Sequence, residues 1–135
     1  MDSMLIVSMP KSGTFRLECS LHSSEGEEAV VVSLIFDTGA DKTSITREVL
    51  MSLGYSVFKC SGIKKRTATG LFKPYECTVS KLVVGKQFSM SNMTVDVLES
   101  SSSPNFDGVL GMDFISLVES VISGSKRTLE ITKSV

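Results

Sequence analysis

Residues 29–36 place the strongest constraint on the fold of this chain, because they form a β-branched, almost wholly apolar run that stops at Asp37-Thr38-Gly39. A short apolar run bounded by turn-forming residues is typical of a strand that is buried on both faces. A carboxylate beside such a strand is unfavourable unless it is hydrogen-bonded, paired or protonated. The run therefore predicts a central strand that delivers Asp37 into a tight loop.

Strands are also predicted on both sides of this run. Residues 14–22 alternate between apolar and polar side chains, which indicates a half-buried strand that forms a hairpin with 29–36. The apolar face of 14–22 carries Phe15, Leu17, Cys19 and Leu21. Further strands are expected at 63–69, 72–82, 93–97, 119–123 and 128–132, with turns at Gly70, 84–87 and 124–126.

Helices contribute little to the predicted fold. A short helix is expected at 47–53, with Ser44 or Thr46 as its cap and Gly54 just after its end. One or two helical turns are expected at 113–118. Many short strands with regular turn signals predict an all-β barrel or sandwich.

The length of 135 residues fits one domain, so residues 1–135 are predicted to be a single domain with its core at about 14–132. No apolar stretch approaches the roughly 20 residues of a membrane-spanning helix, and the N-terminus has no signal-peptide pattern. We therefore expect a cytoplasmic protein with no membrane partner and with reduced thiols. Three cysteines do not make a disulfide framework, although pairing of Cys60 with Cys77 stays open.

The charge balance argues against a nucleic-acid partner. Lys and Arg number 14 and Asp and Glu number 15, which leaves a net charge of −1, and there is no Trp. Barrels that bind single-stranded nucleic acid combine a basic groove with stacking aromatic residues. The basic run at 64–66 is interpreted as the solvated base of a hairpin.

Several kinds of chemistry are excluded by the residues themselves. The single histidine, His22, lies on the polar face of its strand, so no Ser-His-Asp or Cys-His site is expected. Cys19 and His22 point to opposite faces of that strand, which argues against a metal site, and no cofactor motif occurs. Asp37 remains the candidate, either as a functional acid or as a residue that only caps its own turn.

The order of the motifs resembles that of the retropepsin-like aspartic proteases. The resemblance covers residues 14–132 in the family's order and spacing. Its pieces are Phe36-Asp37-Thr38-Gly39-Ala40-Asp41 with Thr43 and Ile45, Thr67-Ala68-Thr69-Gly70, Gly108-Val109-Leu110-Gly111-Met112-Asp113-Phe114, and Thr128-Leu129-Glu130-Ile131. This resemblance implies a closed β-barrel half-lobe with a flap hairpin and one or two short helices, assembled as a symmetric homodimer.

The resemblance also implies a function and a set of site residues. Asp37 would be catalytic, Thr38 would join the two loops across the dyad, and Gly39 would lie close to a polypeptide substrate. Ala40 and Asp41 would line the cleft. Other implied roles are the flap tip for Thr69 and Gly70, and support of the catalytic loop for Val109, Leu110 and Gly111.

The implied activity is that of an aspartic endopeptidase, with a water activated between two Asp37 carboxylates. Since the chain has one Asp-Thr-Gly triplet, the partner carboxylate must come from a second copy. The alternative is a catalytically silent homodimer of the same fold that binds peptides or assembles a larger machine. Two departures from the retroviral pattern are a flap with one glycine at its tip and Met112-Asp113 where a basic residue is common.

Overall fold

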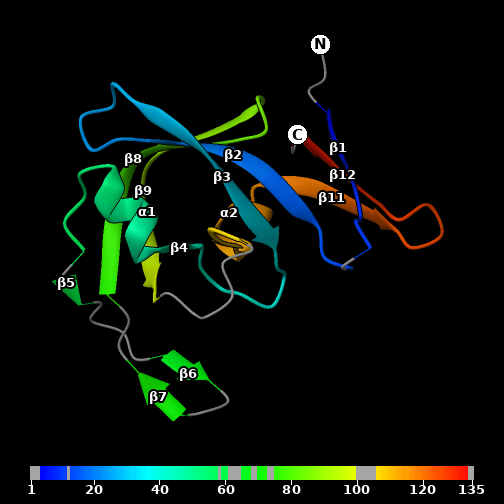
Figure 1. The fold of residues 1–135 in the computed structure, drawn as a ribbon. Helices are drawn as coiled ribbons and strands as arrows, with labels where there is room; N and C mark the ends of the chain where they lie inside the picture. Colours follow the sequence, from blue (N-terminus) through cyan, green and yellow to red (C-terminus); the bar gives the residue numbers. More distant parts are fainter. Residues whose placement is uncertain are drawn as a thin grey trace.

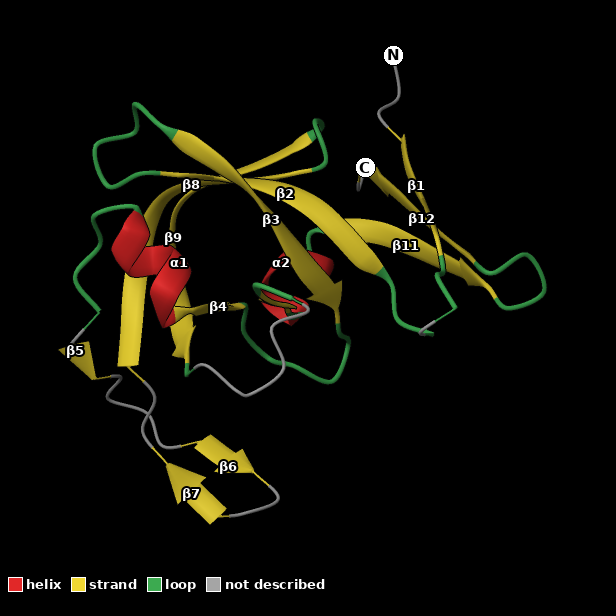
Figure 2. Cartoon of the chain, viewed as in Figure 1, coloured by secondary structure: helices red, strands yellow, loops and turns green. Residues whose placement is uncertain are grey.

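The computed structural model describes residues 4–11, 13–57, 59–60, 65–67, 70–72, 75–99 and 106–133. Strands dominate the chain, and the two helices are short (Figures 1 and 2). These helices are α1 (Arg47–Ser52) and α2 (Met112–Ile115). No helix within the described ranges is long and apolar enough to cross a membrane.

A ring of strands forms the body of the molecule. The neighbours around the ring are β2 (Arg16–His22), β3 (Ala29–Phe36), β10 (Gly108–Leu110), β4 (Ser44–Thr46), β9 (Phe88–Leu98) and β8 (Tyr75–Val84). A pairing of β8 with β2 closes the ring, and β5 (Lys59–Cys60) is added at the edge of β8. The predicted all-β closed barrel is therefore confirmed.

The alternating pattern of β2 is confirmed, because Phe15, Leu17, Cys19 and Leu21 are all buried. The prediction that residues 29–36 are buried on both faces is wrong for the first part of β3. Val31 is 71% exposed, whereas Leu34 is fully buried. The reason is that β10 pairs with β3 only from Leu34 onward, so the first residues of β3 have β2 as their strand neighbour.

One of the predicted hairpins differs from its predicted bounds. The expected hairpin of 63–69 and 72–82 is divided into β6 (Lys65–Thr67) with β7 (Gly70–Phe72), followed by the separate strand β8. Gly70 pairs with Thr67, so it is the first residue of β7 and not the tip of the turn; Thr69 lies outside the described residues. The terminal hairpin consists of β11 (Val118–Ser123) and β12 (Thr128–Lys133), as predicted.

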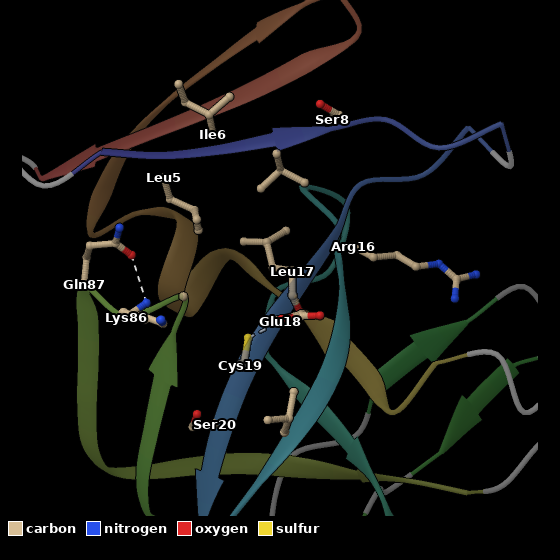
Figure 3. Close-up of a pocket in the computed structure, with 13 residues that line it drawn as sticks. Leu5, Ile6, Ser8, Arg16, Leu17, Glu18, Cys19, Ser20, Lys86 and Gln87 are labelled. Atoms are coloured by element: carbon tan, nitrogen blue, oxygen red, sulfur yellow. Dashed lines mark hydrogen bonds between the residues drawn. The ribbon is translucent and has the colours of Figure 1, made fainter.

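A second sheet contains a strand that the sequence pattern does not predict. β1 (Met4–Ser8) pairs antiparallel with β12, which gives the order β1-β12-β11. The apolar residues Leu5 and Val7 pack with the buried Leu129 and Ile131 against the core. A cavity of about 510 Å³ lies between β1 and β2 (Figure 3), and none of residues 37–43 lines it.

Helix α1 begins and ends where its sequence signals place it. Thr46 is the N-cap residue, although its side chain makes no capping hydrogen bond. Gly54 has φ +85° and donates its N–H to the Met51 carbonyl, while the N–H of Tyr55 reaches the Leu50 carbonyl at 3.1 Å. This pair of hydrogen bonds is the Schellman arrangement, which glycine favours because it adopts a positive φ without strain.

Burial controls the cysteine chemistry. Cys19 and Cys77 are buried free thiols, so the open possibility of a Cys60–Cys77 disulfide is not realised. Desolvation raises the pKa of Cys19 to about 12, and burial also raises the pKa of Cys77. Because the thiolate is the reactive form, both thiols are expected to be inert in the folded protein.

We expect Cys19 and Cys77 to resist alkylation by iodoacetamide at pH 8 in the native protein and to react fully in urea. Mass spectrometry of the digested protein measures the modified fraction at each site. Rapid modification of native Cys19 would contradict its buried placement.

Gly108 is expected to be irreplaceable because β10 lies between β3 and β4. A Cβ at this position would lie 2.1 Å from the carbonyl oxygen of Ser44. Gly108→Ala should therefore lower the free energy of unfolding by roughly 3 kcal/mol or more. Gly124→Ala is the matched control, because a Cβ there meets nothing within 4 Å. Urea unfolding at one fixed protein concentration compares the two, and equal stabilities would contradict this packing.

Candidate active site

Asp37 lies at the point where the buried strand β3 ends. Its N–H donates to the Leu110 carbonyl at 3.1 Å, and its own carbonyl accepts the N–H of Ala40 at 3.2 Å. The carboxylate oxygen Oδ1 accepts the N–H of Gly39 at 2.8 Å. Asp37, Thr38 and Gly39 are all exposed. The strand thus presents a carboxylate in a fixed orientation at the surface.

The contact between Asp37 and Gly39 is also the one expected of a residue that caps its own turn. A Cβ at position 39 would lie 3.2 Å from Asp37 Oδ1, so glycine permits this close approach. The turn geometry therefore fits both interpretations of Asp37, as a functional acid and as a residue that only caps its own turn. The neighbouring strand β10 shows how the position of this loop is fixed.

β10 runs parallel to β3 and supports the Asp37 loop from behind. Residues Val109 and Leu110 pair with Ile35 and Phe36. Beyond them, a Cβ on Gly111 would lie 2.8 Å from the Ala40 carbonyl oxygen and 2.7 Å from the carbonyl carbon of Lys42. The predicted supporting segment, 109–111, therefore lies directly against the Asp37 loop.

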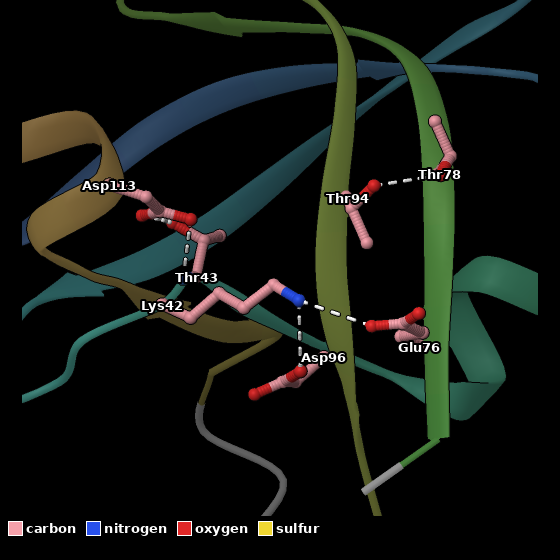
Figure 4. A network of polar contacts seen from close by, with 7 residues as sticks. All are labelled: Lys42, Thr43, Glu76, Thr78, Thr94, Asp96 and Asp113. Atoms are coloured by element: carbon pink, nitrogen blue, oxygen red, sulfur yellow. Dashed lines mark hydrogen bonds and ion pairs between the residues drawn. The ribbon is translucent and has the colours of Figure 1, made fainter. Parts of the chain in front are cut away.

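A buried hydrogen-bond cluster joins this loop to α2 (Figure 4). The Thr43 hydroxyl donates to Asp113 Oδ1 at 2.7 Å and accepts the N–H of Gly111 at 3.1 Å. The N–H of Thr43 donates to Asp113 Oδ2 at 2.9 Å, and the N–H of Phe114 also reaches Oδ1. Thr43 is fully buried.

Sequence reasoning quoted Thr43 and Asp113 as motif residues without assigning them this contact. Asp113 is also part of Met112-Asp113, which stands where a basic residue is common in the retroviral pattern. The two residues are 70 positions apart, and only the parallel placement of β10 beside β3 brings them together. An acid two positions after Gly111, in the first turn of a short helix, is the available signal.

The cleft residues expected from the sequence lie on the same loop. Ala40 is half-buried, and its carbonyl accepts the N–H of Met112 at 2.8 Å. Asp41 is exposed. Its neighbour Lys42 extends to two acids, with Nζ 3.4 Å from Glu76 Oε2 and 3.4 Å from Asp96 Oδ1 (Figure 4). Sequence reasoning did not identify this ion-pair network.

Arg47 joins the segments that flank the β6–β7 hairpin. Its Nε donates to Glu99 at 3.0 Å, its Nη1 donates to the Val57 carbonyl at 3.3 Å, and its guanidinium lies 5.1 Å from the centre of the Tyr75 ring. Hydrogen bonding to Arg47 lowers the pKa of Glu99. The carboxylate of Glu99 is 62% exposed, so we assign this pair a role in orientation more than in stability.

The remaining groups offer no competing site chemistry. In the part of the chain that the structure describes, no three His, Cys, Asp or Glu side chains lie close enough together to hold a metal ion. Asp107, which precedes Gly108, accepts the N–H of Ser33 at 2.8 Å. Asp107 is therefore occupied in holding β3, whereas Asp37 is exposed.

The Thr43 hydroxyl is expected to be essential to the stability of the site. Thr43→Val keeps the side-chain shape but leaves the N–H of Gly111 and the Asp113 carboxylate short of a partner, so it should cost about 2–4 kcal/mol of unfolding free energy. Thr43→Ser keeps the hydroxyl and should cost about 1 kcal/mol. Urea unfolding measures both variants, and equal losses would show that the hydroxyl contributes nothing.

Comparison with known proteins supports the assignment of the fold. Two solved structures match the chain over most of its length. A retropepsin-like aspartic protease from Rickettsia conorii is 22% identical with a TM-score of 0.74, and the match covers 98% of this chain and 92% of that one. The retroviral protease-like domain of Ddi1 from Leishmania major is 15% identical with a TM-score of 0.53, covering 86% of each chain. These likenesses show the retropepsin fold.

Sequence comparison gives the family. No curated protein matches the chain. A family model described as aspartyl protease matches residues 24–114, which include Asp37 and the parallel strand β10. The matched range covers more than half of the 135 residues. The chain therefore belongs to the aspartyl protease family, with a retropepsin-like fold.

Proposed function

We propose that the chain is an aspartic endopeptidase that works as a homodimer, with Asp37 of each subunit at the two-fold axis. The observation that carries the proposal is the placement of Asp37, an exposed carboxylate at the end of a buried strand whose loop is fixed from behind by β10. One chain supplies one such carboxylate, so a second copy completes the pair.

The proposed mechanism follows from two carboxylates that face each other. Such a pair holds one proton, because two like charges at close range do not both ionise. The ionised carboxylate takes a proton from a water as that water attacks the peptide carbonyl. The protonated carboxylate donates to the carbonyl oxygen, and the leaving amine then receives a proton. The peptide is hydrolysed without a covalent intermediate and without a cofactor.

The neighbouring residues have proposed roles that fit their placement. Thr38 is exposed beside Asp37, and we assign its hydroxyl to hydrogen bonds with the loop of the second copy. Gly39, Ala40 and Asp41 line the path of the polypeptide substrate. We assign to Thr69 and Gly70 the role of covering the bound substrate and excluding water.

The terminal sheet supports a dimer. Among the described residues, the edges of β1 and β11 have no further strand neighbour. The outward side chains Met4, Ile6 and Val121 on these strands are 47%, 59% and 60% exposed. Open edges and exposed apolar side chains form a surface that a second copy can cover.

The alternative function is a catalytically silent homodimer of the same fold. It requires the same strands and the same dimer, and it uses Asp37 only to cap its turn. The two functions differ in one respect, which is whether peptide cleavage depends on the Asp37 carboxylate.

Asp37→Asn is therefore expected to lower the cleavage of an unfolded protein by about 10²–10⁴-fold, because the variant has no general base. Cleavage is measured at about pH 4–6, where a carboxylate pair holds one proton. Glu27→Gln, in the exposed turn between β2 and β3, is the control that should keep full activity. Activity that survives Asp37→Asn would contradict the mechanism.

Mixing the wild-type and Asp37→Asn chains tests the shared site. If each copy supplies half of the site, an equal mixture after subunit exchange contains about a quarter of fully wild-type dimers, and activity should fall to about that fraction of an all-wild-type sample. Light scattering gives the mass of the species. A monomer that cleaves peptides, or an activity of one half in the mixture, would contradict the two-copy site.

A further inference from the structure

A cavity of about 730 Å³ opens beside the Asp37 loop, between that loop, β9 and α2. Asp41 and Lys42 line it from the loop, and Asp113 lines it from α2. The apolar part of its wall is Met90, Met93 and Leu117. Asp41 follows Asp37 by four residues in the same loop, so the cavity lies beside the proposed active site.

The carboxylates of this cavity are not equivalent. Both oxygens of Asp113 are engaged by Thr43 and Phe114, as described above. The carboxylate of Asp41 is exposed, and within the described part of the chain it has no hydrogen-bond or ion-pair partner. Asp41 is therefore the group in this cavity that is available to a ligand.

Lys42 does not neutralise this charge. Its ammonium lies 3.4 Å from Glu76 and 3.4 Å from Asp96, so one positive charge is shared between two negative ones (Figure 4). Asp96 is buried, and this charge needs Lys42 close by. The cavity thus combines an apolar wall with an unbalanced negative charge on the loop that carries Asp37.

We propose that this cavity binds a lysine or arginine side chain of the polypeptide substrate. The aliphatic stem lies against Met90, Met93 and Leu117, and the cationic head reaches Asp41. This inference rests on the proposed endopeptidase function and adds to it a preference for substrates with a basic residue near the cleaved bond. An acidic side chain is disfavoured because it meets Asp41 and finds Lys42 already paired.

The test uses a peptide series in which one position at a time carries lysine, norleucine or glutamate. Norleucine keeps the stem and removes the charge. At one position we expect kcat/KM for lysine to exceed that for norleucine by roughly two- to fivefold, the range of an exposed ion pair, with glutamate lowest. High salt should reduce this ratio. A ratio of one at every position would overturn the inference while leaving the endopeptidase function intact.

Variants test which residues cause the higher kcat/KM of the lysine peptide over the norleucine peptide. Asp41→Asn and Met93→Lys should both bring the ratio of lysine to norleucine close to one. Met93→Leu keeps the apolar wall and should keep the ratio, as should Glu27→Gln, which removes an exposed acid in the turn between β2 and β3. If Asp41→Asn lowers cleavage of both peptides equally, Asp41 binds the substrate backbone instead, and the inference is wrong.

A peptide-binding measurement tests this inference independently of the proposed endopeptidase function. The same peptides, fluorescently labelled, are titrated against the Asp37→Asn protein, and anisotropy gives the dissociation constants. Tighter binding of the lysine peptide to a protein whose wild-type form cleaves nothing would support the cavity and overturn the endopeptidase function. Equal binding of lysine and norleucine peptides would overturn the cavity assignment in either case.

Discussion

The rest of the site depends on the hydrogen bonds of the Thr43 hydroxyl. It is buried, and it connects the loop after β3 to the end of β10 and to the start of α2 through Gly111 and Asp113. The same strand, β10, supplies the carbonyl of Leu110 that receives the N–H of Asp37. The position of the exposed carboxylate is therefore set by hydrogen bonds that centre on a fully buried hydroxyl, where a lost partner is costly.

Close packing in this arrangement requires glycine at two positions. β10 fits between β3 and β4 only because position 108 has no side chain, and the loop passes over position 111 for the same reason. A short parallel strand contributes few hydrogen bonds of its own, so its placement relies on this steric fit and on the Thr43 cluster. Rigid support behind an exposed loop is a common way for proteins to fix the geometry of a site.

Local patterns predicted those features that depend on near neighbours. The alternation of Leu17 and Leu21 gave the inward face of β2, and Gly54 gave the end of α1. The exposed Val31 was predicted incorrectly because a β-branched run shows the tendency to form a strand but not the number of strands beside it. β1 was not predicted although Leu5-Ile6-Val7 is an apolar run with β-branched residues, and its pairing could not be read locally because β12 lies at the other end of the chain.

In the candidate site too, residues that are close in the sequence were predicted and contacts between distant residues were not. Asp37, Thr38 and Gly39 are adjacent in the sequence and were found from their motif, and the supporting residues 109–111 followed from the resemblance. The contact of Thr43 with Asp113 and the contacts of Lys42 with Glu76 and Asp96 join residues far apart in the chain. Their side chains meet only after the barrel has closed, so pattern and propensity had no means of pairing them.

The pairing of β1 with β12 has a consequence for the connectivity of the fold. Met4 lies opposite Thr132, so the two ends of the described chain are antiparallel neighbours within one sheet. Antiparallel neighbours can be joined by a short hairpin turn. The chain can then be reopened at an exposed turn such as that at Gly124 without breaking the barrel or the Asp37 loop. The topology is therefore nearly circular, because the same strand arrangement is kept when the termini are moved to another turn.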